Sequence, residues 1–444
     1  MDIIVIGLGV GGEEVAGRLA ASGLDVLGIE NRLVGGECPY WGCIPSKMMI
    51  RAANAVAEAR RVPTFAGDAT VRPDWGPVHA RIRDEATDNW NDQVAVDRFT
   101  GKGGTFLRGR GQLTGPGRVR VGSEEYEATK GVVIATGTTP AIPPIPGLAD
   151  SPYWTNRDAI EAAELPASLT VLGGGAIGLE LSQVYARFGV AVTVVEASDR
   201  ILALEEPESS KVAREALTAD GVTVHVGRRA VKVDGTTVYL DDGTEVTSDK
   251  ILVATGRRVD LAGLGLDTLG LDPSARNLEV DEWMRAGERL WAVGDVTGRG
   301  AFTHIAMYQA DIAVRDILGQ GGPAADYKAL PRVTFTDPEI GAVGLTEAQA
   351  RERGLTVGTG YSPLGSSTRG WIHGVGDEGF IKLVVDTDRG VLVGATSAGP
   401  AGGEVLAGLA VAVHAEVPVE TLRSMIYAYP TFHRAISEAV RAIH

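Results

Sequence analysis

The chain opens on the stretch Ile3-Ile4-Val5-Ile6-Gly7-Leu8-Gly9-Val10-Gly11-Gly12. Four apolar residues in a row are typical of a buried parallel strand, and here they lead directly into a glycine-rich turn. A helical stretch from Glu13 to Ser22 follows, and a second apolar run, Val26 to Ile29, closes on Glu30. This order of strand, turn, helix, strand and acid predicts a dinucleotide-binding unit.

Each glycine of this turn has a separate part in binding a dinucleotide. Gly7 makes the tight turn, Gly9 lets the backbone approach a pyrophosphate, and Gly12 brings the helix close to the strand. The N-terminus of the helix then faces the pyrophosphate, and the Glu30 carboxylate can accept hydrogen bonds from both ribose hydroxyls.

The same construction returns later in the chain. An apolar strand, Leu169 to Leu172, precedes a second glycine-rich turn, and a strand over Val192 to Val195 ends on Glu196. The glycines of this turn that match the first copy are Gly173, Gly175 and Gly178. Gly7 and Gly173 are 166 residues apart, as are Glu30 and Glu196. The repeat therefore predicts two dinucleotide sites, in two domains.

Each copy is followed by a strand that ends on a similar turn, Val132 to Gly137 in the first and Ile251 to Gly256 in the second. Small residues such as these, with Thr136 beside Gly137, let a ligand lie close to the backbone. A third strand end, Leu290 to Asp295, places a carboxylate where it could accept from hydroxyl groups. Taken alone, that last feature fits a turn cap better than a ligand site.

Composition limits the class of protein. The 444 residues are 44% hydrophobic and 22% charged, which are ordinary globular values. The 59 glycines make about 13% of the chain against about 7% in an average protein, which favours many tight turns or close backbone approaches. A net charge of -15 argues against nucleic acid as a partner. We find no run of 18 apolar residues and no cleavable leader, so we expect a soluble, cytoplasmic protein with no membrane partner.

Only two cysteines occur, Cys38 and Cys43. They lie in Gly35-Gly36-Glu37-Cys38-Pro39-Tyr40-Trp41-Gly42-Cys43-Ile44-Pro45-Ser46-Lys47, which precedes a helix expected over roughly 46–61. Cys43 is thus expected near the helix N-terminus, where the helix dipole lowers a thiol pKa. Lys47, one turn further on, adds positive charge to the same face.

Three other interpretations of the cysteine pair compete with redox chemistry. A structural disulfide closing so short a loop would contribute only about 2 kcal/mol and is unusual in the cytosol. A zinc site would need further ligands, and neither a CxxC nor a closely spaced His pair accompanies the two cysteines. Two inert buried thiols are the third alternative. Redox chemistry is favoured because the pair directly follows a dinucleotide site.

The segment from Gly35 to Lys47 resembles the active-site signature of the class I FAD-containing pyridine nucleotide-disulfide oxidoreductases, whose members include dihydrolipoamide dehydrogenase and glutathione, mycothione and mercuric reductases. The resemblance covers essentially the whole chain, since Pro331 to Glu339 and Val343 to Glu347 are similar to the start of the family's dimerisation domain. It implies an α/β fold with two Rossmann-like dinucleotide-binding domains, for FAD and NAD(P), and a C-terminal α+β dimerisation domain. The expected ranges are 1–143 for FAD, 144–260 for NAD(P), 261–327 for a return to the flavin and 328–444 for dimerisation.

The resemblance also implies a role for each motif. FAD should occupy the first fingerprint, with Glu30 on its ribose and Asp295 on its ribityl chain; the other residues expected at FAD are Gly7, Gly9, Gly12, Gly36, Lys47, Thr136 and Gly137. The nicotinamide nucleotide should occupy the second fingerprint, at Gly173, Gly175, Gly178, Glu196 and Gly256. Lys47 should lie beside flavin N5 and pair with Glu180.

The resemblance further implies that hydride passes from the nicotinamide to the flavin, whose electrons open a Cys38–Cys43 disulfide. Cys43 should then stay against the flavin as a thiolate while Cys38 attacks the substrate. Glu196 would repel a 2′-phosphate and accept from a free 2′-hydroxyl, so NADH is favoured. NADPH stays open, because Arg200 could accommodate a phosphate if its side chain swung over.

The family pattern breaks in the last domain. Reductases of small disulfides usually carry His-Pro-Thr followed by Glu, and that His, from the partner subunit, protonates the leaving thiolate. Here Pro430-Thr431 sets the register, so Tyr429 stands at the His position and Arg434 at the Glu position. A phenol is a poorer base than imidazole but a usable proton donor. His433, expected one helical turn beyond Tyr429, is the alternative, with Glu438 five residues further on.

We therefore expect a homodimeric enzyme that reduces a small disulfide, with each active site completed by the partner's C-terminal domain. The cysteine count excludes the second, C-terminal redox pair of mercuric reductase and of high-molecular-weight thioredoxin reductase. One alternative is an NAD(P)H oxidoreductase that passes electrons from the flavin to a quinone, a dye or the other nicotinamide, with the cysteines subordinate. Another is a flavin-bearing sensor without turnover. No metal is expected.

Overall fold

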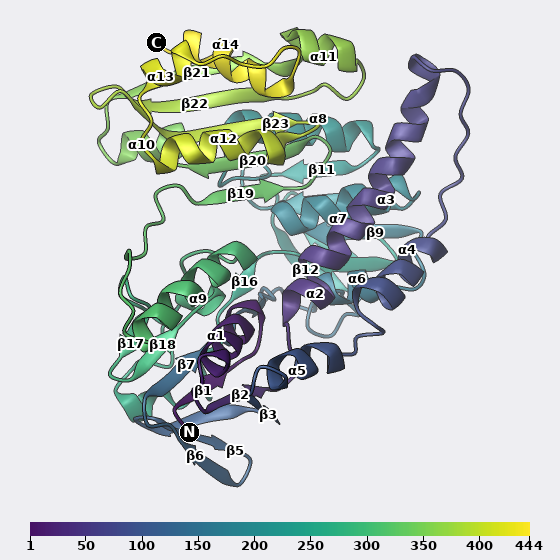
Figure 1. Cartoon of the computed structure of the whole chain (residues 1–444). Coiled ribbons are helices and arrows are strands. Elements are labelled where there is room, and N and C mark those ends of the chain that lie inside the picture. Colours follow the sequence, from purple (N-terminus) through teal and green to yellow (C-terminus); the bar gives the residue numbers. More distant parts are fainter. The chain divides into compact units, whose positions relative to one another are not determined.

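The computed structural model describes residues 1–444 and divides into two compact units (Figure 1). The first unit contains Met1–Ser46, His79–Ala141 and Gly256–Asp326, and the second contains Lys47–Val78, Ile142–Thr255 and Tyr327–His444. None of the helices is both long and apolar enough to cross a membrane.

The first unit is built on a six-stranded sheet. The strand order is β17(Arg285–Gly287), β18(Leu290–Ala292), β7(Gly131–Ile134), β1(Ile3–Ile6), β2(Val26–Glu30) and β3(Thr105–Arg108). All neighbours are parallel except β17 and β18. Every residue of β1 and β2 is buried, as their unbroken apolar runs predicted.

Helix α1(Val10–Ala21) follows β1 and packs against α9(Thr303–Ile317). It begins three residues earlier than the sequence indicated, because Gly9, in an extended conformation, is its N-cap. The other elements of this unit are α2(Glu37–Trp41), α5(Gln93–Thr100), β4(Gly111–Gly115), β5(Arg118–Val121), β6(Glu124–Glu127), β8(Thr139–Pro140), β16(Arg257–Arg258) and the short helical segments Ile82–Ala86, Leu266–Leu269 and Asp295–Thr297. Helix α4(Gly76–Arg81) crosses the boundary between the units, and so does α3(Cys43–Arg61).

The second unit contains the repeated nucleotide fold. Its parallel sheet has the order β11(Thr223–Val226), β10(Ala191–Glu196), β9(Ser168–Leu172) and β15(Lys250–Val253). Helices α7(Ala176–Arg187), α8(Pro207–Ala219) and α6(Asn156–Glu161) accompany it, together with an antiparallel sheet of β12(Ala230–Asp234), β13(Thr237–Leu240) and β14(Glu245–Thr247). Two Rossmann-like sheets are therefore present, as the repeat predicted.

The C-terminal part of the second unit is an antiparallel five-stranded sheet, drawn in green to yellow in Figure 1. Its order is β19(Pro331–Thr334), β20(Glu339–Gly344), β23(Val391–Gly399), β22(Phe380–Asp386) and β21(Val357–Pro363). Helix α12(Gly402–His414) packs on β20 and β23, and α14(Ala435–Arg441) packs on β21 and β22. The remaining helices here are α10(Glu347–Glu352), α11(Thr368–His373) and α13(Val419–Ser424).

Candidate functional site

The first glycine turn has the geometry that a pyrophosphate needs. A Cβ at Gly7, where φ is +92°, would lie 2.5 Å from the Ala135 carbonyl oxygen, and a Cβ at Gly12 would lie 2.0 Å from the Gly7 oxygen. Both positions are therefore closed to any side chain. At Gly9 the nearest atom is 4.0 Å away, so the space in front of the N-terminus of α1 is open, and a side chain would fill it.

The Glu30 carboxylate holds this turn in place. It is buried, and it accepts backbone N–H groups of Leu8 at 2.8 Å and of Arg32 at 2.7 Å, one on each oxygen. A carboxylate has about four acceptor positions, so two stay open for hydroxyl groups. The site fits the ribose and pyrophosphate of FAD.

The second turn, in the other unit, repeats this geometry. A Cβ at Gly173 would lie 2.4 Å from the Ala254 oxygen and one at Gly178 would lie 2.3 Å from the Gly173 oxygen, whereas nothing lies within 4 Å of a Cβ at Gly175. The Glu196 carboxylate accepts N–H groups of Gly174 at 2.6 Å and of Ser198 at 2.7 Å. These donors are the counterparts of Leu8 and Arg32, again 166 residues on.

Arg200 follows Glu196, and hydrogen bonds within its own loop hold its guanidinium. It donates to the carbonyl oxygens of Leu202, Ala203 and Glu205 and to the Ser210 hydroxyl, at 2.7–3.0 Å. A swing of this side chain toward a 2′-phosphate would break these hydrogen bonds. The alternative that Arg200 receives NADPH is therefore disfavoured.

Four further residues were predicted at a nucleotide from their positions after strands: Thr136, Gly137, Gly256 and Asp295. Thr136 is exposed, directly beyond β7, and Gly137 follows it with φ +65°. Gly256 has φ +120° and no atom within 4 Å of a built Cβ. The Asp295 carboxylate accepts from the Thr138 hydroxyl at 2.7 Å. Arg257 in turn donates to this hydroxyl oxygen at 2.7 Å, which fixes the Asp295 side chain beside the end of β7.

The cysteine segment passes directly over the first glycine turn. The N–H of Gly35 donates to the Leu8 oxygen at 2.7 Å, and a Cβ at Gly36 would lie 2.8 Å from the Gly9 Cα. Gly36 also has φ +69°, which favours glycine. The two glycines therefore bring the following residues, α2 with Cys38 and then Cys43, close to the open side of the turn.

Both cysteines are thiols in this structure, with Cys38 half-buried and Cys43 exposed as the first residue of α3. A hydrogen bond with the Cys43 side chain, together with burial, raises the pKa of the Cys38 thiol well above its usual range. No group of three or more His, Cys, Asp or Glu side chains in the structure is placed to hold a metal ion.

One contact at the cysteines was missed by the sequence interpretation. The Thr303 hydroxyl lies 3.4 Å from the Cys43 sulfur and also acts to lower the pKa of Cys38 through a hydrogen bond. Thr303 is the first residue of α9, 260 residues further along the chain. The only local signal for Thr303 was a hydroxyl residue at the start of a helix.

Lys47 and Glu180 are paired within the second unit. Lys47 Nζ lies 2.9 Å from Glu180 Oε2, and the N–H of Phe335 donates to the other oxygen at 2.8 Å. The Lys47 ammonium also lies 4.5 Å from the centre of the Phe335 ring. The Glu180 side chain is only 7% exposed, whereas the Lys47 side chain is 35% exposed.

The C-terminal segment differs from the sequence expectation. Residues 425–431 are not helical, since the next helical turn begins at Phe432. The expectation that His433 lies one helical turn from Tyr429 is therefore wrong, because the residue before a proline disfavours the helical conformation. Tyr429 is 64% exposed, and the Arg434 guanidinium lies 5.4 Å from its ring centre.

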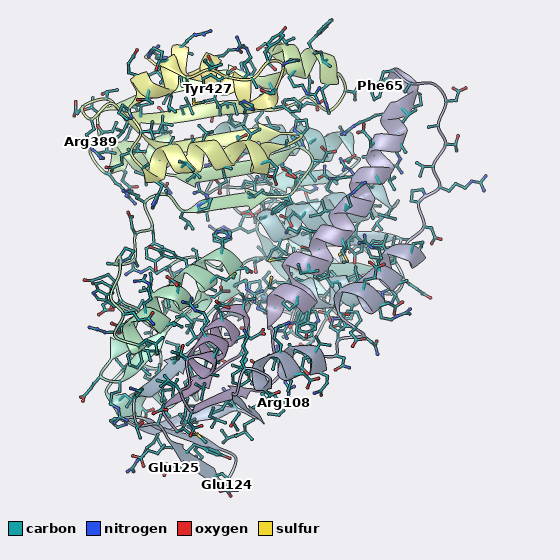
Figure 2. The ribbon with its side chains drawn as sticks, viewed as in Figure 1. Phe65, Arg108, Glu124, Glu125, Arg389 and Tyr427 are labelled. Atoms are coloured by element: carbon teal, nitrogen blue, oxygen red, sulfur yellow. The ribbon has the colours of Figure 1, made fainter.

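His433 is half-buried against its own segment. Its Nε2 lies 3.4 Å from the Thr431 hydroxyl, and its ring lies 6.3 Å from the ring of Tyr427, which is labelled in Figure 2. Glu438 accepts from Ser362 at 3.2 Å. Of the two candidate proton donors, Tyr429 has the more accessible side chain.

The fold and these sites define a class of protein, one with two dinucleotide-binding units and a pair of thiols against the first. The chain belongs to the family described as pyridine nucleotide-disulphide oxidoreductase, which matches residues 1–310; residues 330–440 match the dimerisation domain of the same family. It is therefore an FAD-dependent, NAD(P)H-linked oxidoreductase, as the sequence resemblance implied.

Named relatives cover nearly the whole chain. A dihydrolipoyl dehydrogenase of Halobacterium salinarum is 36% identical over 99% of this chain and 95% of the relative, and a mercuric reductase of Staphylococcus aureus is 31% identical over 99% and 81%. Among solved structures, LpdA from Mycobacterium tuberculosis is similar with a TM-score of 0.87 and 28% identity, covering 99% of both chains. The HOCl-induced flavoprotein disulfide reductase RclA from Escherichia coli is similar with a TM-score of 0.86 and 25% identity, also over 99% of both.

Proposed function

We propose that this enzyme reduces a small disulfide with electrons from NADH. The observation that carries the proposal is the position of the Cys38 and Cys43 thiols. They directly follow Gly35 and Gly36, which pass over the glycine turn of the first nucleotide site. Dihydrolipoyl dehydrogenases among the relatives support a lipoyl-type disulfide as the first candidate substrate.

FAD is assigned to the first unit and NADH to the second. Residues 1–143 and 261–327 hold FAD through the first glycine turn, Glu30 and Asp295. Residues 144–260 hold NADH through the second turn, where Glu196 receives the free 2′-hydroxyl. FAD, when bound, supplies a two-electron relay between NADH and the cysteine pair.

The protein's part in the reaction is thiol exchange and proton transfer. The Cys38 thiolate attacks one sulfur of the substrate disulfide, which forms a mixed disulfide and releases one substrate thiolate. Cys43 then attacks the Cys38 sulfur, so the Cys38–Cys43 disulfide reforms and the second substrate thiol leaves. Per turnover, one NADH and one proton convert one disulfide into two thiols.

Tyr429 is assigned the protonation of the first leaving thiolate. This assignment requires a homodimer, in which Tyr429 of the partner subunit lies at the active site, and residues 328–444 form the interface. The match of residues 330–440 to a dimerisation domain supports it. Lys47 and Glu180 are assigned a positioning role as an ion pair of the second unit, in which the ammonium provides a fixed positive charge.

The test compares the wild type with Cys38→Ser and Cys43→Ser in the purified holoenzyme. Anaerobic titration with NADH should give a long-wavelength absorption band from a thiolate against the flavin, and Cys43→Ser should abolish it. Cys38→Ser should lower lipoamide reduction at least about a thousandfold while dye reduction survives. If the wild-type flavin bleaches without the band, and quinone or dye reduction survives in both variants, the disulfide reductase is refuted and the quinone or dye reductase replaces it.

A further inference from the structure

The Thr303 hydroxyl is a side-chain hydrogen-bond partner shared by the two sulfurs. It lies 3.4 Å from Cys43 Sγ, and a side-chain hydrogen bond also joins it to Cys38. When a cysteine pair is reduced and loses one proton, a negative charge stays on a sulfur, and it needs a donor. A hydroxyl that reaches both sulfurs can donate to either of them.

The position of Thr303 is set by elements of the first nucleotide site. The carbonyl of Phe302, in extended conformation, accepts the N–H groups of Ile305 and Ala306 and so begins α9. Gln309, fully buried one turn further on, accepts the Gly294 N–H at 2.7 Å. Helix α9 also packs closely on α1, since a Cβ at Gly11 would lie 3.2 Å from the Ala306 side chain. Thr303 is therefore held by the core that carries the glycine turn.

We propose that Thr303 is a catalytic residue of this enzyme, whose hydroxyl donates a hydrogen bond to the Cys43 thiolate of the reduced cysteine pair. The N-terminal end of the 15-residue helix α9 adds a positive dipole on the same side. The inference rests on the proposed redox role of Cys38 and Cys43 and adds to it a donor outside the signature segment.

The charged groups near the pair are engaged elsewhere. Lys47, further along α3, is paired with Glu180, and Glu37 on α2 faces Arg257 at 3.6 Å. His304 on α9 stacks on Phe302 at 5.2 Å. The largest effects on the Cys38 thiol come from Cys43, from burial and from Thr303. Because the hydroxyl does not titrate in this range, the thiolate keeps its donor from acid to alkaline pH.

The experiment measures the alkylation rate of each cysteine in the NADH-reduced holoenzyme. Iodoacetamide is added between about pH 5 and pH 10, a range that spans the usual thiol pKa, and the Cys38 and Cys43 peptides are quantified by mass spectrometry. The variants are Thr303→Val, which keeps the shape and removes the hydroxyl, and Thr303→Ser, which keeps the hydroxyl. Thr100→Val is the matched control, because this exposed hydroxyl on α5 donates only to backbone oxygens.

We expect Thr303→Val to raise the pH midpoint of Cys43 alkylation by about one unit, since a hydrogen bond to a charged group has this strength. The long-wavelength absorption band should be lost at a correspondingly higher pH. Thr303→Ser and Thr100→Val should retain the wild-type midpoint, and unchanged flavin content would show that each variant is folded.

A Thr303→Val midpoint equal to that of the wild type would overturn the assignment of Thr303, and so would equal shifts in the Val and Ser variants. In either case the proposed function would stand, because NADH would still make both cysteines alkylatable. If NADH does not expose the cysteines in the wild type, the redox role of the pair fails, and the role of Thr303 fails with it.

Discussion

Lys382 is a buried cation that forms ion pairs with three carboxylates, and its replacement by an uncharged residue should strongly destabilise the fold. The Lys382 side chain lies on the buried strand β22 and is only 7% exposed. Its Nζ lies 3.0 Å from Glu206, 2.9 Å from Glu208 and 3.1 Å from Glu347. Glu206 and Glu208 belong to the start of α8, and Glu347 belongs to α10. The cluster therefore joins the second nucleotide sheet to the antiparallel sheet within one unit.

The loss of stability in Lys382→Met can be derived from the carboxylates that lose their positively charged partner. Glu206 keeps one backbone donor on its other oxygen and Glu347 keeps Arg351. Glu208 has no second hydrogen-bond partner, because its other oxygen is buried and unpaired. Breaking a buried ion pair on one side costs about 3–5 kcal/mol. For a chain of 444 residues, the unfolding temperature of the variant should therefore fall by about 5 °C at pH 7.

The difference in stability between the wild type and Lys382→Met should decrease at acid pH. Burial alone would raise the pKa of Glu347, but hydrogen bonds from Arg351 and Lys382 outweigh it and lower the pKa below its usual value. A carboxylate of lowered pKa contributes stability above its unfolded pKa, about 4.3, and loses it as pH falls through the folded value. Burial would lower the pKa of Lys382, but Glu208 and Glu206 raise it, so its contribution is fully present below about pH 10.

The assay is thermal unfolding of wild type and Lys382→Met at several pH values. The difference in unfolding temperature should be largest between about pH 7 and 9 and should shrink below about pH 4, as the pH falls through the lowered pKa of Glu347. Lys232→Met is the control, because Lys232 is 56% exposed and lies 3.5 Å from Asp234; it should change stability by less than about 1 kcal/mol. A deficit equal to the control, or one that grows toward pH 4, would refute the reasoning.

Two further predictions concern the nucleotide sites. Gly175→Ala adds a methyl group with no protein atom within 4 Å, so thermal stability and flavin content should be unchanged while the KM for NADH rises at least about tenfold; an unchanged KM would exclude this turn as the NADH site. Glu196→Ser removes the acceptor for the 2′-hydroxyl, so the ratio of kcat/KM for NADH over NADPH should fall at least about tenfold. A ratio that stays constant would mean that another group selects the nucleotide.

The two nucleotide units were predictable because their signals are local. Strand, turn, helix and acid lie within about 30 residues, so the whole pattern can be recognised in one short stretch of sequence. At these equivalent positions the Glu30 and Glu196 carboxylates accept equivalent backbone N–H groups. The α/β class and the two parallel sheets are therefore confirmed.

Other parts of the site could not be read from local patterns. The contacts of Thr303 with the sulfurs, and of Lys382 with α8, join residues more than 170 positions apart. Periodicity reports which face of an element is buried, not which distant side chain it meets. The segment around Tyr429 was mistaken for helix because the helical spacing of Tyr429 and His433 was given more weight than the proline between them.

The two copies of the repeat share the course of the chain after the acid, although only the first copy contains cysteines. In both copies, the segment after the acid returns over its glycine turn: Gly35 donates to the oxygen of Leu8, and Leu202 donates to the oxygen of Gly174. Gly36 and Leu202 are 166 residues apart, and both have positive φ, +69° and +47°.

The residues of the segment after the acid differ between the two copies. In the first copy two glycines allow an approach of 2.8 Å between a Gly36 Cβ and the Gly9 Cα, and the chain continues directly into Cys38. In the second copy Ile201 and Leu202 fill this place, and the chain continues through the acidic start of α8, whose Glu206 and Glu208 bind Lys382. The same course of the backbone thus leads to thiols after one glycine turn and to a contact with the antiparallel sheet after the other.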